Sequence, residues 1–153
     1  MSASVMIEPW ESGADADFAA LGRLVGELGY PLEGNAVAGR LLRMQAMGTV
    51  IPSDLLVARL PKSGEIVGFL HIVVPALIEI DAAAEIWGLV VSDGHRGKRI
   101  GQRLVEAAEA WASERGVNTI RLRTNEIRTD AHRFYERLGF DHVKTSRVYS
   151  RTL

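Results

Sequence analysis

Residues 85–101 decide the fold of this chain; they read EIWGLVV (85–91), SDGH (92–95) and RGKRIG (96–101). The first segment is an apolar run with β-branched residues, which favours a buried strand. The last segment is basic and glycine-containing, and it leads into apolar residues that recur at helical spacing from Ile100 to Trp111. The stretch therefore predicts a strand, a short loop and a long helix.

The loop and helix start at residues 94–105 have the character of a phosphate site. A helix that begins near Lys98 leaves its first N–H groups without helical acceptors and places partial positive charge there. Gly97 and Gly101 allow close backbone approach, and four cations occur among residues 94–105 without an acidic one. Neither a Walker loop nor the G-x-G-x-x-G fingerprint is present. Taken alone, the stretch is either a phosphate site or a solvated basic helix start.

The remaining elements follow from periodicity and turn residues. Strands are predicted at 5–8, 55–59, 65–74, 84–91 and 119–124, with one or two more between 140 and 153. Helices are predicted at 15–28, about 35–47, about 98–115 and 131–138. The turn at 61–64 (PKSG) makes the second and third strands a hairpin, and 84–124 forms a β-α-β unit. The order β-α-α-β-β-β-α-β-α-β indicates an α/β or α+β sandwich on a mixed sheet.

The composition of the chain limits the classes of function that it can have. With 153 residues, 47% of them hydrophobic, and no internal repeat or linker, the chain is predicted to be one domain, 1–153. The absence of cysteine excludes disulfides, thiolate metal sites and a cysteine nucleophile. A net charge of −1 disfavours nucleic-acid binding. No apolar run is long enough to span a membrane, and the N-terminus lacks the features of a signal peptide, so a cytoplasmic location is expected.

Two motifs resemble those of the GNAT superfamily of N-acetyltransferases. Residues 89–101, L-x-V-x-D-x-x-R-G-K-R-I-G, are similar to its acetyl-CoA motif, R/Q-x-x-G-x-G/A after a strand that reads L-x-V. Asn125 and residues 131–140, A-x-x-F-Y-x-x-x-G-F, are similar to its second signature. Two departures occur, because Arg99 stands where the family most often has glycine and Asp93 where proline is common. The resemblance implies a mixed, mostly antiparallel twisted sheet flanked by helices.

The resemblance also implies a donor and its binding residues. Acetyl-CoA would bind as co-substrate, with no metal, in a V between strands 85–91 and 119–124, where Gly88 is expected to mark a bulge. Its pantetheine arm would pair with the backbone of Leu89, Val90 and Val91, and Asn125 would contact the pantetheine or acyl region. The pyrophosphate would lie on the amides of six consecutive residues: Arg96, Gly97, Lys98, Arg99, Ile100 and Gly101.

By the same resemblance, Tyr135 is the candidate general acid, since a phenol can protonate the departing thiolate. Glu85 is the candidate general base; four residues before Leu89 on a regular strand, it is expected to share Leu89's face. The alternatives are a core tyrosine and an exposed strand-start glutamate, with Glu79 as the reserve base. The histidines His71, His95, His132 and His142 show no metal-ligand spacing, and His71 is interpreted as a sheet residue rather than part of the cleft.

The predicted reaction is direct attack by a primary amine on the thioester in a ternary complex. The amine would enter beside the helices of 15–47, with Glu27, Glu33, Glu79, Asp81 and Glu85 as the acidic residues available to a cationic acceptor. A small-molecule amine and a peptide or protein amine both remain open. A non-catalytic CoA-binding regulatory domain is the rival function. No nucleic-acid or membrane partner is expected, and a homodimer is left open.

Overall fold

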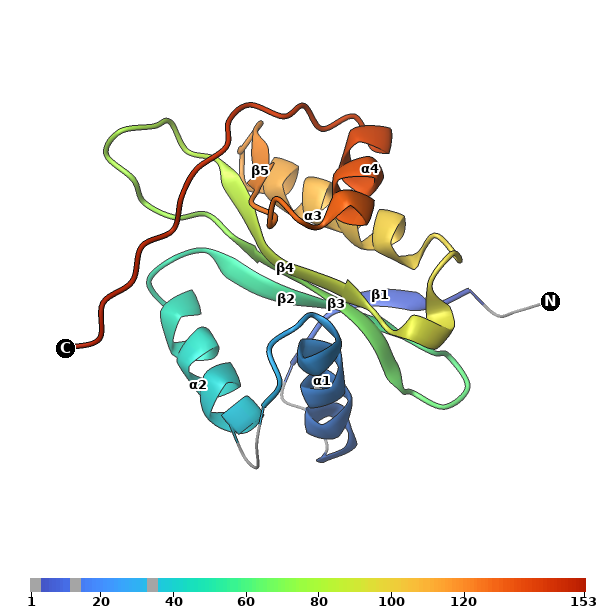
Figure 1. The fold of residues 1–153 in the computed structure, drawn as a ribbon. Helices are drawn as coiled ribbons and strands as arrows, with labels where there is room; N and C mark the ends of the chain where they lie inside the picture. The colour runs from blue at the N-terminus through green and yellow to red at the C-terminus, as the bar shows by residue number, and fades with distance from the viewer. Residues whose placement is uncertain (1–3, 12–14, 33–35) are drawn as a thin grey trace. The chain divides into compact units, whose positions relative to one another are not determined.

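A computed structural model describes residues 4–11, 15–32 and 36–153 (Figure 1). The elements are β1 (Met6–Pro9), α1 (Asp15–Glu27), α2 (Ala36–Gly48), β2 (Ser53–Arg59), β3 (Ile66–Val73), β4 (Ala84–Val91), η1 (Asp93–His95), α3 (Ile100–Glu114), β5 (Ile120–Leu122) and α4 (Thr129–Arg137). The predicted order is confirmed from β1 to α4. The chain divides into two compact units, 1–122 and 123–153, which are described separately.

The first unit is built on a five-stranded sheet in the order β1-β2-β3-β4-β5. The first four strands pair antiparallel, and β5 pairs parallel to β4 through the crossover α3. The predicted hairpin turn is confirmed: Gly64 has φ +73°, and the Leu60 amide donates to the carbonyl of Glu65. The sheet is therefore mixed and mostly antiparallel, as the resemblance implied.

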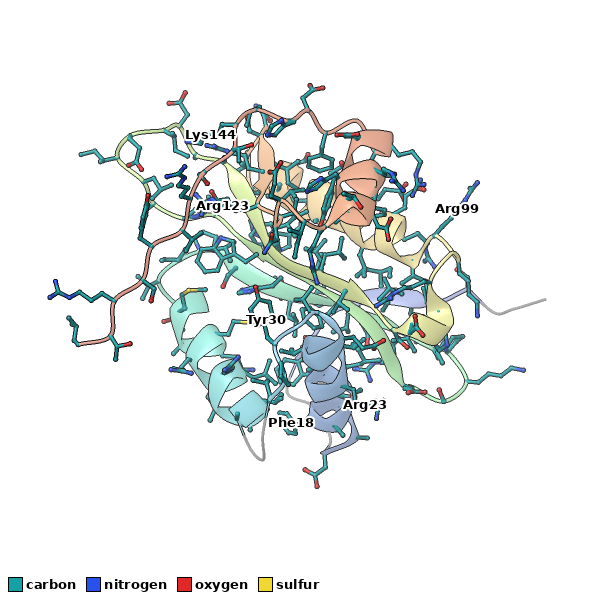
Figure 2. All side chains as sticks on the ribbon, in the orientation of Figure 1. Phe18, Arg23, Tyr30, Arg99, Arg123 and Lys144 are labelled. Carbon is teal, nitrogen blue, oxygen red and sulfur yellow. The ribbon has the colours of Figure 1, made fainter. Side chains whose placement is uncertain are left out.

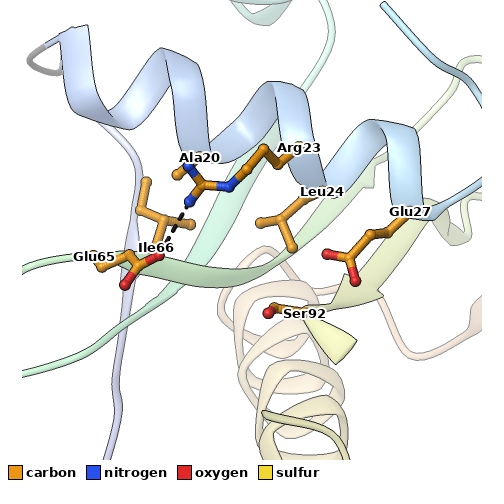
Figure 3. A pocket seen from close by; sticks show the side chains of 7 residues that line it. All are labelled: Ala20, Arg23, Leu24, Glu27, Glu65, Ile66 and Ser92. Atoms are coloured by element: carbon orange, nitrogen blue, oxygen red, sulfur yellow. Dashed lines mark hydrogen bonds and ion pairs between the residues drawn. The ribbon is translucent and has the colours of Figure 1, made fainter. Parts of the chain in front are cut away.

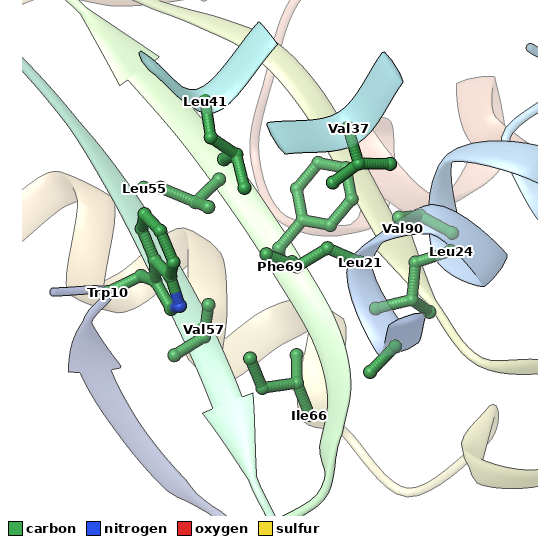
Figure 4. Packing of buried hydrophobic residues seen from close by; sticks show 11 residues of the cluster. Trp10, Leu21, Leu24, Val37, Leu41, Leu55, Val57, Ile66, Phe69 and Val90 are labelled. Atoms are coloured by element: carbon green, nitrogen blue, oxygen red, sulfur yellow. The ribbon is translucent and has the colours of Figure 1, made fainter. Parts of the chain in front are cut away.

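Helices cover both faces of this sheet, with α1 and α2 on one side and α3 on the other (Figure 1). Strands buried on both faces need continuous apolar sequence, which explains why β3 reads IVGFLHIV. On the α3 side, a Cβ at Gly68 would lie 3.4 Å from Leu104 Cδ1. On the other side, Phe69 and Val90 belong to the core cluster beneath α1 and α2 (Figure 4). The two faces of β3 and β4 can thus be assigned residue by residue.

An ion-pair network joins β1, α1 and β2 at the edge of this core. Arg59 donates to Asp17 from Nη1 at 2.8 Å and from Nη2 at 3.1 Å, and to Glu8 from Nε at 2.8 Å. The indole of Trp10 also donates to Asp17. Asp17 is only 8% exposed, and the hydrogen bond from Arg59 lowers its pKa. A buried carboxylate with three donors holds α1 to the strands.

The second unit contains α4 and the segment that follows it. The helix ends as predicted at Gly139, whose φ of +91° allows the Phe140 amide to donate to the Tyr135 carbonyl. Residues 140–153, all of which are described, contain neither helix nor strand, so the strands predicted there are wrong. The physical reason is that a strand requires a hydrogen-bonded partner, and this unit has no strand to pair with.

Candidate active site

A β-bulge lies in the middle of β4. His71 pairs with Gly88 and the next residue, Ile72, pairs with Ile86, so Trp87 is an extra residue in β4. The predicted bulge is confirmed, with Trp87 as the inserted residue and Gly88 beside it.

The bulge reverses the alternation of side chains along β4. Glu85 pairs with Val73 and therefore shares the α1 side of the sheet with His71 and Gly88. Leu89 pairs with Leu70 and lies on the α3 side. The prediction that Glu85 and Leu89 share one face is wrong, because one inserted residue shifts a period of two to the opposite face.

The two strands of the β-α-β unit pair over a short region only. Parallel pairing joins Ala84 to Ile120, Glu85 to Arg121 and Ile86 to Leu122, and it extends no further within the described residues. β4 continues for five more residues, 87–91. β5 ends at Leu122 and is three residues long rather than the six expected, so the divergence of these strands stays a prediction. Within the unit 1–122, one edge of β4 therefore has no partner strand at residues 87–91.

The loop after β4 is held against the end of α1. Asp93 opens η1, and its backbone N–H donates to Glu27 Oε1 at 2.8 Å. Proline has no N–H and could not make this bond. The departure from the family's common proline thus has a structural reason, because the loop is tied to α1 through a donor that proline lacks.

The side chain of Arg96 stabilises the same loop through hydrogen bonds. Its Nε donates to the Val91 carbonyl at 3.0 Å and its Nη1 to Asp93 Oδ1 at 3.2 Å. Its Nη2 lies 3.9 Å from Glu27. The guanidinium therefore connects the end of β4, the short η1 turn and α1.

The helix α3 begins at Ile100, two residues later than predicted, because Arg99 has the left-handed φ of 61°. The first helical bond runs from the Arg103 amide to the Arg99 carbonyl. The amides of residues 97–102 have no backbone acceptor within the described parts of the chain. The side chain of Arg99 is exposed and points away from the ribbon (Figure 2).

Glu85 lies in a small cluster of polar and aromatic side chains on the α1 side. The Trp87 indole donates to Glu85 Oε2 at 2.9 Å and packs edge-on against His71, with ring centroids 5.7 Å apart. Glu85 is 7% exposed, which removes the alternative of an exposed strand-start glutamate. The reserve base, Glu79, is exposed in the β3–β4 loop. Of the two carboxylates, only Glu85 is buried at the bulge.

The residues of the second motif lie in the unit 123–153. Asn125 Oδ1 accepts from the Ile127 amide at 3.2 Å, and its carbonyl accepts from Arg128 and from His132 Nε2, so Asn125 shapes the turn before α4. Tyr135 packs edge-on against Phe134 and Phe140. Burial raises the pKa of Tyr135 to about 12, opposed by the charge of Arg128.

A shallow polar pocket lies between α1 and the ends of β3 and β4 (Figure 3). Arg23 and Glu65 form an ion pair at 3.0 Å across it, and Glu27 and Ser92 line its other end. None of the predicted catalytic residues borders it. Sequence reasoning did not anticipate the role of Glu27 beside it, because nothing local connects this helix residue to an amide 66 positions away.

Two properties of the described residues bear on the predicted partners. No helix among them has the length and apolar character needed to cross a bilayer. No group of three or more His, Cys, Asp or Glu side chains among them is arranged to hold a metal ion.

Comparisons with known proteins agree with this geometry. The Acetyltransferase (GNAT) family profile matches residues 34–140. An aminoalkylphosphonate N-acetyltransferase of Salmonella typhimurium is 39% identical over 80 residues, and the match spans about half of each protein (52%). Among solved structures, a transcriptional regulator from Bacillus halodurans C-125 is 26% identical with a TM-score of 0.73, covering 95% of this chain and 99% of its own.

AAC(6')-Iy in complex with the bisubstrate analogue CoA-S-monomethyl-acetylneamine is 15% identical, with a TM-score of 0.77, and covers 99% of this chain and 100% of its own. At that identity, the likeness shows the fold. The family profile covers more than half of the chain and includes the β4 bulge, the loop and α4. This chain therefore belongs to the acetyltransferase (GNAT) family.

Proposed function

We propose that this protein transfers an acetyl group from acetyl-CoA to the primary amine of a small molecule, by direct attack in a ternary complex. Two observations carry the proposal together: β5 leaves the edge of β4 unpaired at residues 87–91, and the amides of residues 97–102, at the start of α3, have no backbone acceptor among the described residues. We propose further that residues 1–153 act as one domain, since the family profile crosses the boundary at residue 122.

The donor fits these elements in two parts. An extended pantetheine arm can hydrogen-bond along β4 at Leu89, Val90 and Val91 as an added strand does. A pyrophosphate can accept from the amides of residues 97–102, at the positive end of α3. The Arg96 amide contributes less than predicted, because it already donates to the Asp93 carbonyl at 3.4 Å. Lys98 and Arg99, both exposed, add positive charge.

Bound acetyl-CoA supplies the thioester, and the chain supplies proton transfer and orientation. Glu85 takes a proton from the acceptor ammonium, and the freed amine attacks the thioester carbonyl. A β4 amide near Leu89 stabilises the oxyanion. The C–S bond then breaks and Tyr135 donates its proton to the thiolate. Tyr135 regains a proton from the attacking nitrogen, which loses one as it becomes the amide. Burial raises the pKa of Tyr135 to about 12, which keeps the phenol protonated at neutral pH until it is needed.

A small primary amine is the acceptor best supported. The named activity of the Salmonella relative is on aminoalkylphosphonates, and the AAC(6')-Iy complex holds an acetylneamine analogue. The acidic side chains proposed to attract a cation are fewer than expected, because Glu27 is engaged by the Asp93 amide. Glu33 lies outside the described residues. The other acidic side chains proposed for this role are exposed Glu79 and Asp81 and the buried Glu85, which also accepts a hydrogen bond from Trp87.

The test is thiol release from acetyl-CoA with a panel of aminoalkylphosphonates, aminoglycosides, polyamines, amino acids and a peptide, beside calorimetry of CoA binding. Turnover of a small amine is expected. Turnover of the peptide alone would move the acceptor class to protein amines. CoA binding without turnover would indicate a regulatory domain, and failure to bind CoA would refute both.

The catalytic residues are tested with a matched pair of variants. Tyr135→Phe should lower kcat by roughly a hundredfold or more, as expected for loss of a general acid, while leaving the Kd for CoA within about threefold. Tyr149→Phe removes a hydroxyl from a tyrosine that is 83% exposed and should change neither quantity. Unchanged kcat in Tyr135→Phe would remove Tyr135 from the mechanism.

A further inference from the structure

His71 lies at the bulge of the sheet with an unusual environment for an imidazole. It is on β3, directly opposite Gly88, and its ring packs edge-on against Trp87. Its Nε2 atom is buried and makes no hydrogen bond with any described residue. Burial also lowers the pKa of His71, so the ring is neutral at pH 7.

A structural role explains this arrangement poorly. In folded proteins, roughly nine in ten buried polar groups have a hydrogen-bond partner, and a histidine kept only for packing is no exception. An apolar side chain would fill the same space without burying a polar atom that lacks a partner. The buried Nε2 atom of His71 therefore lies where no described protein group pairs with it.

The neighbours of His71 are those of the proposed amine site. Glu85 and His71 lie on the same face of the sheet, and Trp87 contacts both, by a hydrogen bond to the first and by ring packing to the second. Gly88, the residue paired with His71, has no side chain; a Cβ built there would lie 3.5 Å from Phe69 and 3.9 Å from Leu28. The face is the one covered by α1 and α2.

We propose that His71 is an acceptor-binding residue, whose Nε2 accepts a hydrogen bond from the amine nitrogen of the substrate. This inference rests on the proposed function. With Nδ1 protonated, Nε2 presents a lone pair to an N–H, and the amine is held between His71 and Glu85. Glu85 takes the proton that the ammonium must lose, and His71 gains and loses none. Its contribution is to direct the amine's remaining lone pair toward the thioester.

The test compares His71→Phe, His71→Gln and a control, His142→Phe, in the exposed segment after α4. Each is assayed with the best amine of the panel, together with CoA calorimetry and thermal unfolding. His71→Phe should lower kcat/KM for the amine by roughly ten- to a hundredfold, the effect of losing one hydrogen bond to a charged or polarised group. CoA affinity should stay within about threefold. His71→Gln offers an amide oxygen and should recover part of the loss.

The outcomes separate the inference from the function it rests on. Wild-type protein that turns over no amine refutes the proposed function, and the role of His71 with it. Wild-type turnover with unchanged kcat/KM in His71→Phe refutes only the role of His71. Equal losses in His71→Phe and His71→Gln, with a lowered Tm in both, would make His71 a structural residue of the sheet. A change in the His142→Phe control would show that the loss is not specific to His71.

Discussion

Arg99→Gly and Arg99→Ala, made side by side, test whether the start of α3 holds its arginine in a strained backbone. Arg99 is the only non-glycine residue of the described chain with positive φ, at 61°. Residues with a Cβ pay about 1–2 kcal/mol in the left-handed region, and glycine does not. Glycine loses part of this advantage through its greater freedom in the unfolded chain.

The expected difference follows from these two terms. Both variants remove the same exposed cation, so the charge cancels in the comparison and only the backbone remains. Arg99→Gly should be more stable to unfolding than Arg99→Ala by about 1 kcal/mol. For a chain of 153 residues this corresponds to a Tm difference of about 3 °C. Urea unfolding followed by circular dichroism gives the free energies, and calorimetry gives Tm.

The same variants show why a residue other than glycine occupies this position. If the cation assists the pyrophosphate, Arg99→Gly and Arg99→Ala should both weaken CoA binding, and Arg99→Lys should retain it. Arg99→Ala as stable as Arg99→Gly would refute the strained conformation. CoA affinity unchanged in all three variants would refute a phosphate role for the side chain and leave only its backbone amide.

Three further predictions concern the contacts that support the site. Asp17→Asn should lower the free energy of unfolding by about 2–3 kcal/mol, because it leaves the guanidinium of Arg59 only partly paired. The pKa of Asp17 is lowered below 3.8 in the folded protein. The ionised carboxylate therefore stabilises the fold above that pH, and this stabilisation is lost as the pH falls through the folded pKa. Acid titrations should show that the free energy of unfolding falls less in Asp17→Asn than in the wild type. Glu27→Ala should cost about 1 kcal/mol in urea unfolding. The cost should be smaller in an Asp93→Pro background, where the N–H donor is absent and only the 3.9 Å approach of Arg96 to Glu27 is left; equal costs would refute the hydrogen bond. With the pKa of Tyr135 at about 12, kcat should show no alkaline decline from this group below pH 10, and a decline near pH 9 that disappears in Tyr135→Phe would contradict it.

Local sequence determined most of the elements because their causes are local. Ala84–Val91 is a strand with the predicted bounds, since an apolar run of that length between turn residues has few other uses. Gly64 lies in the predicted turn between β2 and β3, and Gly139 follows the end of α4 as predicted, because glycine favours the left-handed conformation at both positions. The loop of 92–99 and the cations beside it were also predicted, because the start of a helix and the charged residues around it can be identified from the sequence alone. The strands predicted after Phe140 were wrong because pairing needs a partner that no local pattern supplies.

The chemistry of the site depended on contacts that only the tertiary structure decides. The pairing of β3 with β4 makes Trp87 the inserted residue of a bulge. Because of this insertion, Glu85 lies on the α1 side of the sheet and Leu89 on the other side. Glu27 met the Asp93 amide because α1 packs beside the end of β4. The unpaired Nε2 of His71 is a property of its surroundings and not of its position in an apolar run. A sequence pattern gives each residue's preference along one chain, whereas register, burial and hydrogen-bond partners arise between segments, and these determine which groups can meet a substrate.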